Sequence, residues 1–560
     1  MNRKKIYSFL VLSLAAVFSM SPFALAAAAT QTGYASSGSQ TEKIGNKFQS
    51  DSFNQEMVYN EMLGAVNAGS NDRASIAGQL QNELNFTEVN YDADMAAEGA
   101  ASASNSNTGC KSCNKAEAEL ENEIDVENSN LAWIMNLLKL KASGGKNKGG
   151  GSSAGAAKVD VSVKNSANAN MTDIASSLNG AVLASNSNTG AHSKNKAEAE
   201  LENEIDVENY NFADIANKIE ASAKTGENKN CGSHYSSYSC QKQCPCPTNS
   251  PCPTTCPSHS PTATSTPDES AGDAQSNVEV TNMANSNETN IEIDFEPAMV
   301  AAYNANTGYG SSNIAEAELE NEIDVENYNM AFITNEVKNE ANSGNSDSGR
   351  KSWSGNSQSA GDASAETEIN NYANSNKTAI SADFGGDIIA SNTQTGCESY
   401  NNAEVEVKNE IEVKNENFAE IHNYVKNSAN SGEDKNGKNK GCRGCYDGNS
   451  SSGDATSSVQ ITNQLNMNET EISVDLGGDV SAANTMTGAK SENNSQTEVK
   501  NSIEAVNKNF AEVSNYVVVA SNTGNNSSDY SRAATQDNGA DSGASLIITN
   551  QSNKNVVKVE

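Results

Sequence analysis

The sequence contains few of the side chains from which enzyme active sites are usually built. Only four histidines occur among 560 residues, and they share no position in the repeats described below. The sequence has no G-x-S-x-G, H-E-x-x-H or phosphate-binding loop. Two tryptophans and five arginines leave little with which to stack on sugars or hold an acidic polysaccharide. The composition therefore predicts a protein that is not an enzyme.

Proline and positive charge are also scarce. Seven of the nine prolines lie within residues 245–267, so the remaining chain is almost free of the residue that interrupts strand ladders. Acidic residues outnumber basic ones by 72 to 37, which gives a net charge of −35. Such a surface repels nucleic acid and anionic lipid and suits cations or basic partners. We therefore expect no nucleic-acid partner.

The N-terminus has the pattern of a secretory signal peptide. Three basic residues, Arg3 to Lys5, precede an apolar run from Ile6 to about Met20, and Ala24-Leu25-Ala26 is a small-residue cleavage site. Residues 1–26 are therefore predicted to be removed on export. No later stretch is apolar enough to span a bilayer. The mature chain is expected to be secreted or at the cell surface, without inserting into the membrane.

One 13-residue phrase indicates the architecture. AEAELENEIDVEN occurs unchanged at Ala116–Asn128, Ala197–Asn209 and Ala315–Asn327, and in altered form at Ala403–Asn415 and Ser495–Asn507. Each copy begins seven residues after the glycine of an (N/Q/M)TG turn. The chain is therefore a repeat array, a class that usually acts through shape and surface.

The phrase has the period of a β-strand. In the second copy three asparagines share one parity with the apolar residues Ala197, Ala199, Leu201, Ile205, Val207, Ala213 and Ile215, while the other parity carries Glu198, Glu200, Glu202, Glu204, Asp206 and Glu208. Period two predicts a strand with one apolar face and one acidic face. A helix is the alternative, because Ala, Glu and Leu are good helix formers. Helical spacing would bury glutamates, and Val405 and Val407 favour a strand.

A second motif precedes each TG turn, as in Val278–Asp294 (VEVTNMANSNETNIEID). Asparagines recur in it at fixed positions, and we interpret them as stacked turn residues whose amides bond their counterparts in the next layer. The aligned residues are Asn165, Asn282, Asn371, Asn463 and Asn550, followed by Asn170, Asn287, Asn376, Asn468 and Asn555.

Together the motifs predict an all-β repeat array, most simply a parallel β-solenoid, with a long antiparallel meander as the alternative. The connectors, rich in Gly, Ser and Asn, are expected to be disordered. The predicted divisions are residues 1–26 (signal peptide), 27–79 (N-terminal cap without repeats), 80–143, 156–224, 272–341, 362–429 and 454–521 (repeats 1 to 5), 225–271 (Cys/Pro-rich connector) and 544–560 (truncated half-repeat).

Rows of carboxylates are a candidate calcium site. Six acidic residues on one face of one strand repel one another, and stacked layers would add to the repulsion. Calcium takes several carboxylate oxygens and would offset it, whereas the alternative is a solvated face that maintains solubility. The calcium candidates are Glu117, Glu119, Glu121, Glu123, Asp125, Glu127, Glu198, Glu200, Glu202, Glu204, Asp206, Glu208, Glu316, Glu318, Glu320, Glu322, Asp324 and Glu326.

Eleven cysteines occur in a chain that is expected to be exported. Disulfides are then the default interpretation, and a zinc knot is the alternative. Cys397 has no nearby partner and is a candidate for a crosslink between molecules. The disulfide candidates are Cys110, Cys113, Cys231, Cys240, Cys244, Cys246, Cys252, Cys256, Cys442 and Cys445.

The repeats resemble a known group of proteins. The segment Ser452-Gly-Asp-Ala455, followed by VQITNQLNMNET and an NTG-type turn, is similar to Asn-rich repeat proteins of bacteria that are predicted to be exported. That resemblance implies a surface location and repetitive β structure. Curli-type subunits are also Asn-rich, but their short repeat with regular Gln and Gly is absent here.

These features predict a secreted structural protein of the cell surface, an extracellular matrix or an appendage. The last repeat matches only the first half of the unit, so its strand edge is expected to pair with another subunit. We therefore expect self-association or contact with other surface components. The alternative is an adhesin or calcium-dependent binding protein that presents loops on a repeat scaffold. A disordered acidic coat is a third possibility.

Overall fold

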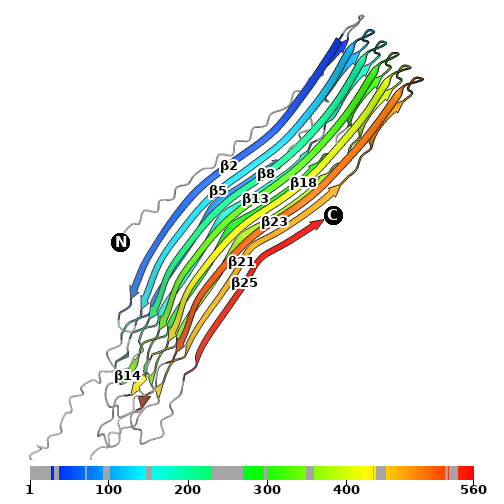
Figure 1. The fold of residues 1–560 in the computed structure, drawn as a ribbon. Coiled ribbons are helices and arrows are strands. Elements are labelled where there is room, and N and C mark those ends of the chain that lie inside the picture. The colour runs from blue at the N-terminus through cyan, green and yellow to red at the C-terminus, as the bar shows by residue number, and fades with distance from the viewer. Residues whose placement is uncertain are drawn as a thin grey trace, which may run out of the picture.

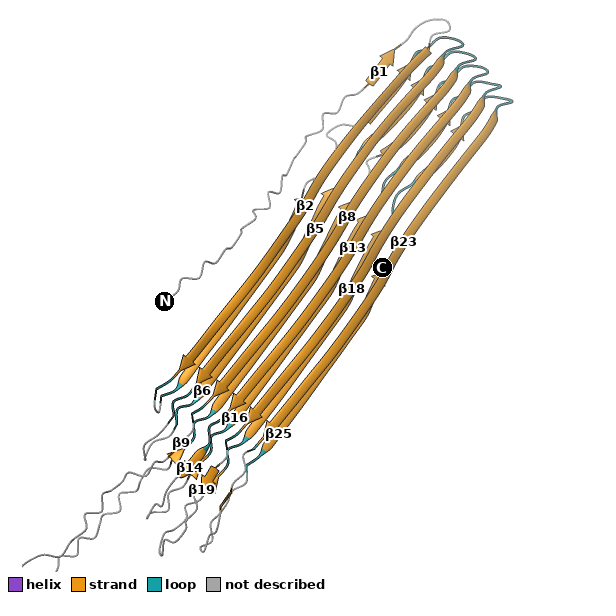
Figure 2. Ribbon diagram, turned by 60° about the vertical axis from the view of Figure 1, so that its left-hand side comes forward, coloured by secondary structure: helices purple, strands orange, loops and turns teal. Residues whose placement is uncertain are grey.

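The computed structural model describes residues 27–30, 37–69, 72–92, 101–146, 154–178, 180–226, 228–229, 269–295, 299–348, 358–432, 434–436, 450–523, 527–528 and 540–560. Within these ranges the chain is a stack of parallel strands and contains no helix (Figures 1 and 2). None of the described segments is therefore a helix long and apolar enough to cross a membrane. The predicted parallel β-solenoid is confirmed, and the antiparallel meander is excluded by the parallel pairing of neighbouring strands.

The strands form three main sheets of six. The long sheet consists of 31-residue strands: β2 (Ser37–Asn67), β5 (Cys113–Ser143), β8 (Lys194–Lys224), β13 (Ser312–Asn342), β18 (Tyr400–Asn430) and β23 (Glu492–Asn522). The middle sheet consists of β3 (Ala74–Asp92), β6 (Ala157–Ser177), β11 (Ala274–Asp294), β16 (Ala363–Asp383), β21 (Ala455–Asp475) and β25 (Ser542–Val559). The short sheet consists of β1 (Ala27–Thr30), β4 (Ala101–Ser106), β7 (Ala181–Ser187), β12 (Met299–Ala305), β17 (Ile388–Thr393) and β22 (Val480–Thr485).

One rung is a short strand, a long strand and a middle strand in chain order. The long strand forms one layer, and the middle and short strands form the layer that packs against it. The connectors lie mostly outside the described residues, but their described ends add two narrow sheets at one side of the stack. These are β9 (Asn228–Lys229), β14 (Ser346–Ser348), β19 (Asp434–Asn436) and β24 (Ser527–Ser528), and β10 (Glu269–Ser270), β15 (Gln358–Ser359) and β20 (Ser450–Ser451).

The predicted divisions meet the strands differently at the two ends of the chain. Residues 37–67, expected to lie in a cap, form β2, which pairs with β5 along its full length from Ser37↔Cys113 to Asn67↔Ser143. The boundary placed at residue 80 falls inside β3. The half-repeat 544–560 forms most of β25, the sixth strand of the middle sheet. Counted by rungs, the described strands make six sets of three, so the terminal half-repeat completes a rung.

The core follows the parity of the sequence. In β8 the apolar residues of one parity point inward and are buried, namely Ala197, Ala199, Leu201, Ile205, Val207, Ala213 and Ile215, while the intervening Glu and Asp residues face outward and remain partly exposed. Fully burying each Leu, Ile or Val contributes about 1.5–3 kcal/mol relative to exposure. The alternative helix is excluded because this strand continues without interruption through all 31 residues.

Asparagines that are buried in the inner rungs stack in columns between the apolar residues. Asn82, Asn165, Asn282, Asn371, Asn463 and Asn550 form one such column, in which each Nδ2 donates to the Oδ1 of the next rung at 2.7–2.8 Å. These residues lie within strands, so the interpretation as turn residues was wrong, although the predicted amide bonding between layers is confirmed. The satisfied amides allow polar side chains to be buried in a dry interior.

The left-handed asparagines belong to another column. Asn85, Asn168, Asn285, Asn374, Asn466 and Asn553 all have φ of 52–57° in the middle of their strands. Asparagine tolerates this conformation better than other residues with a Cβ. Each amide also donates to the next rung, as Asn285 does to Asn374 at 2.9 Å. The backbone pairing of the middle strand is therefore interrupted at a single position, while the side-chain hydrogen bonds between rungs continue there.

Candidate functional site

The outer face of the long sheet carries the acidic rows. The strand register aligns Glu117 with Glu198 and Glu316, and it aligns Asp125 with Asp206 and Asp324. Like charges are therefore adjacent both along each strand and between rungs. The three unchanged copies of the phrase form the second, third and fourth rungs, so this region has the highest density of carboxylates.

Several carboxyl groups in these rows have pKa values above those of free carboxyl groups. Burial, followed by the charges of Glu208, Asp324 and Asp125, raises the pKa of Asp206 to about 7. Burial likewise raises the pKa of Asp324 to about 6, with the nearby Lys414 acting against it. The pKa values of Glu200, Glu202, Glu204 and Glu318 are raised by the same two causes, burial first and neighbouring carboxylates second.

Lysines border this region on both sides. In the first rung Lys43 and Lys47 pair with Glu119 and Glu123, each at 2.6 Å. In the fifth rung Lys408 reaches Glu320 at 2.5 Å and Lys414 reaches Glu326 at 2.9 Å. Cross-strand ion pairs therefore neutralise part of the charge at the borders of the unchanged copies.

No group of three or more His, Cys, Asp or Glu side chains is arranged to hold a metal ion in the part of the chain that the structure describes. The carboxylates are spread along rows rather than converging on a point, because every second residue of a strand faces the same way. Calcium binding along the rows stays a prediction.

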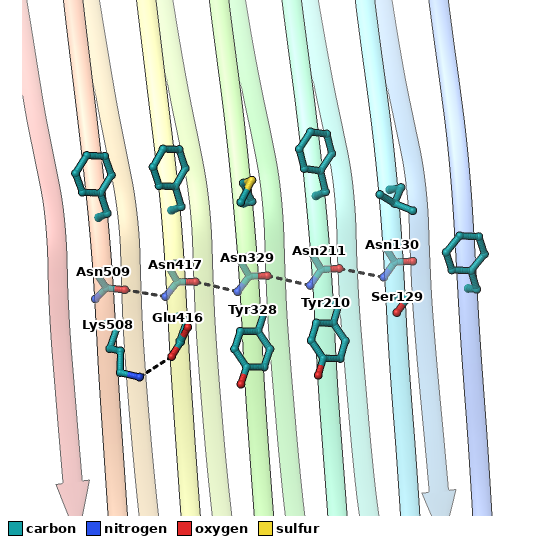
Figure 3. Close-up of a pocket in the computed structure, with 16 residues that line it drawn as sticks. Ser129, Asn130, Tyr210, Asn211, Tyr328, Asn329, Glu416, Asn417, Lys508 and Asn509 are labelled. Atoms are coloured by element: carbon teal, nitrogen blue, oxygen red, sulfur yellow. Dashed lines mark hydrogen bonds and ion pairs between the residues drawn. The ribbon is translucent and has the colours of Figure 1, made fainter.

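The outer face of the long sheet also carries a groove of ≈ 640 Å³ that crosses the rungs (Figure 3). It lies next to the acidic rows, on the C-terminal side along each long strand. Tyr210 and Tyr328 stack with ring centroids 5.0 Å apart and planes 3° apart. Phe418 and Phe510 stack in the same way at 5.0 Å and 8°. The buried ladder of Asn130, Asn211, Asn329, Asn417 and Asn509 lies between the two columns.

The groove was not predicted from the sequence, although a signal was present. Tyr210 and Tyr328 follow the acidic phrase at the same offset, and Phe212, Met330 and Phe418 follow two residues later. All of them occupy the outward parity. Because period two repeats in register, an aromatic residue at a fixed offset must form an exposed column.

The last rung of the stack differs from its interior. Ile205, Ile323 and Ile411 in one inward column are 0% exposed, but Ile503 in β23, the last strand of that column, is 41% exposed. In β25 the inward residue Ile548 is 38% exposed, whereas Ile461 beside it is 0% exposed. Apolar core residues are therefore left open at the end formed by β22, β23 and β25.

Three of the cysteines lie in described residues. Cys110 and Cys113 are exposed free thiols in this structure, and disulfide formation by the candidate cysteines stays a prediction. The turn between them is held by buried hydrogen bonds: Ser112 contacts Thr108 at 3.0 Å, and Asn114 donates to both hydroxyls. Cys397 is also an exposed free thiol. The remaining candidates, Cys231, Cys240, Cys244, Cys246, Cys252, Cys256, Cys442 and Cys445, lie outside the described residues.

The described histidines lie apart. His192 is in a TG turn, with its ring edge-to-face against Tyr309. His422 is on the outer face of the long sheet, beside Glu420 at 2.5 Å. His234 and His259 lie outside the described residues.

Comparison of the chain with protein families, curated proteins and solved structures finds no match. The resemblance to Asn-rich exported repeat proteins therefore stays a prediction, and function is argued from the geometry alone.

Proposed function

We propose that this chain is a secreted structural protein of the cell surface, an extracellular matrix or an appendage, and that it self-associates end to end. The observation that carries the proposal is the open core at the end formed by β22, β23 and β25. Apolar residues that are buried in every inner rung are exposed there, among them Val499 at 49% and Ile503 at 41%. Exposed apolar strand edges favour pairing with another chain.

The interior supports a structural role in a second way. Every rung has the same three strands in the same register, so the strand ladders run along the whole stack, and several asparagine columns run with them. In-register stacks of this kind are stiff because every rung is bonded to both neighbours. The acidic outer face keeps such an object soluble and opposes side-by-side aggregation.

Negative-stain electron microscopy of residues 27–560, purified under oxidising conditions, tests this function. We expect rods or filaments several times longer than one stack. Deleting Leu546–Glu560 removes most of β25 and should abolish assembly. Unchanged polymer length after the deletion would rule out end-to-end assembly through this edge.

A pair of point variants separates assembly from folding. Ile548→Lys places a charge on the inward, exposed side of β25, and Ile547→Lys places the same charge on the outward side, where the side chain is 54% exposed. We expect the first variant to leave dispersed stacks and the second to polymerise as the parent does. Circular dichroism should show unchanged β structure in both variants.

The second candidate function is an adhesin or calcium-dependent binding protein. The aromatic groove and the raised pKa values of Asp206 and Asp324 favour it, since the groove and these half-buried carboxyl groups lie on the outer face of the long sheet and neither is needed to close the core. Dispersed monomers in the microscope would favour this candidate over the first.

A further inference from the structure

The asparagine ladders have a direction. In one column Asn46 donates from Nδ2 to Oδ1 of Asn122 at 2.7 Å, and the pattern continues in the same sense through Asn203, Asn321 and Asn409 to Asn501. Asn501 accepts a hydrogen bond from Asn409, and its own Nδ2 has no acceptor among the described residues. The column therefore presents a donor at the C-terminal end of the stack.

The opposite end presents acceptors. Asn46 and Asn60 each donate to the second rung, at 2.7 and 2.9 Å, and no described residue donates to their Oδ1 atoms. Asn85 shows the same polarity, because its Oδ1 is buried without a hydrogen-bond partner. Ladders that begin one rung later have the same direction: the Oδ1 atoms of Asn105, Asn114 and Asn128 are buried and unpaired, but they lie beneath the first rung and do not face the end of the stack. An unsatisfied buried acceptor costs about 1–3 kcal/mol.

The two ends match in register. The strand pairings place Asn46 and Asn501 in one column and Asn60 and Asn515 in a second. They place Asn82 and Asn550 in a third, within the middle sheet. If the first rung of one copy followed the last rung of another, donors would meet acceptors in all three columns at once.

Charge and apolar residues agree with the same alignment. In the long sheet Lys43 shares its column with Glu498, so the junction would place opposite charges side by side on the outer face. Ile44 shares its column with Val499, and Phe48 shares its column with Ile503, so the exposed core residues of the last rung would be covered by apolar ones. A shift of this register by one residue would move every side chain of the paired strand to the opposite face of the sheet.

We infer that the partner at the open end is a second copy of this chain, with its β2 and β3 pairing in parallel with β23 and β25 at the register Asn46↔Asn501 and Asn82↔Asn550. This inference rests on the proposed end-to-end assembly and gives it a polarity and a register. The resulting fibre is polar, with all copies oriented the same way.

Cysteine crosslinking tests the register. Thr41 and Gln496 face outward in one column, and five strand spacings of about 4.8 Å, about 24 Å in all, separate them within a chain. A disulfide between Thr41→Cys and Gln496→Cys must therefore join two copies, since bridged Cα atoms lie within about 7 Å. We expect this double variant to form a ladder of covalent oligomers, with the joined peptides identified by mass spectrometry.

Gly45→Cys combined with Gln496→Cys is the matched control. A side chain at residue 45 meets nothing within 4 Å, and the position is four residues, about 13 Å, out of register. Fibres that crosslink through residue 41 but not residue 45 support the inference. Fibres that crosslink through residue 45, or through neither, overturn the register but leave end-to-end assembly intact. Absence of fibres in the unmodified protein overturns both.

A second pair of variants tests the polarity. Asn501→Asp replaces the exposed donor by an acceptor that would face Asn46 Oδ1, so fibres should shorten at least tenfold. Asn493→Asp makes the same change on the same strand, in a column whose first-rung position is Gly38, which has no amide side chain. Its fibres should keep the parental length. Equal fibre lengths for the two variants would contradict the ladder junction.

Discussion

The Nδ2 of Asn203 donates a hydrogen bond to the Oδ1 of Asn321 at 2.7 Å, although 118 residues of sequence separate them. That interval includes the whole Cys/Pro-rich connector, 225–271. Both side chains are 0% exposed. The repeat register therefore survives a long insertion, because each rung is aligned by its neighbours and not by the length of the connector.

Breaking a ladder in the interior should be costly. Asn203→Leu leaves Asn122 without its acceptor and Asn321 without its donor, both in a dry environment, so we expect a loss of about 2–5 kcal/mol. Asn370→Leu is the control, since this asparagine is only partly buried and bonds Glu368. Its effect should stay within about 0.5 kcal/mol. Denaturation midpoints followed by circular dichroism measure both, and equal midpoints would refute a role for the ladder in stability.

The stacked TG turns should not accept a side chain. A Cβ on Gly308 would lie 2.6 Å from Cα of Ala191, in the turn of the preceding rung. We expect Gly308→Ala to destabilise the stack by about 1–3 kcal/mol. Gly45→Ala adds the same methyl group where nothing lies within 4 Å, and it should be neutral or stabilising by up to about 1 kcal/mol. Thermal unfolding of both variants measures the difference, and a neutral Gly308→Ala would contradict the close packing of the turns.

Stability should rise as the pH is lowered from 8 to 5. Asp206 has a pKa of about 7 in the folded chain, where burial and neighbouring carboxylates disfavour its charge, against about 3.9 when unfolded. The folded state therefore binds this proton more tightly. The resulting stabilisation is complete below about pH 4 and is lost as the pH rises through about 7. Asp324, with a pKa of about 6, acts in the same direction.

The variant Asp206→Asn should flatten this pH dependence and raise the unfolding midpoint at pH 8. Glu471→Gln is the contrasting variant, because Lys558 lowers the pKa of Glu471 and its contribution is lost only as the pH falls. That variant should leave the slope between pH 5 and 8 unchanged. A parental slope in Asp206→Asn would exclude this carboxyl group as the cause.

Calcium should raise the melting temperature if the acidic rows bind it. Scanning calorimetry in calcium and then in EDTA measures the effect, and a divalent ion that binds only the folded state stabilises it by mass action. Glu200→Gln with Glu204→Gln should remove the response, since burial and then the charge of neighbouring carboxylates raise the pKa of both groups. Glu471→Gln, outside the rows, should keep it. A melting temperature indifferent to calcium removes the calcium-dependent candidate.

The sequence by itself determined the strands and their faces. Alternation with period two is a local property, so the parity of Ala197, Glu198 and Leu201 was sufficient to predict which side chains lie inside. The repeat spacing was sufficient to predict stacking, and the fixed positions of Asn165 and Asn282 predicted amide bonds between layers.

Only the tertiary structure decided which segments make up a rung and how the strands of successive rungs align. Residues 37–67 lack the repeated phrase, yet they form β2 in full register with β5, because the inward parity and the neighbouring strand are sufficient to align them. The placement of Asn165 within a strand and the left-handed column through Asn168 were likewise not predicted from the sequence. Each depends on contacts between rungs that are distant in sequence, and a local pattern cannot specify those contacts.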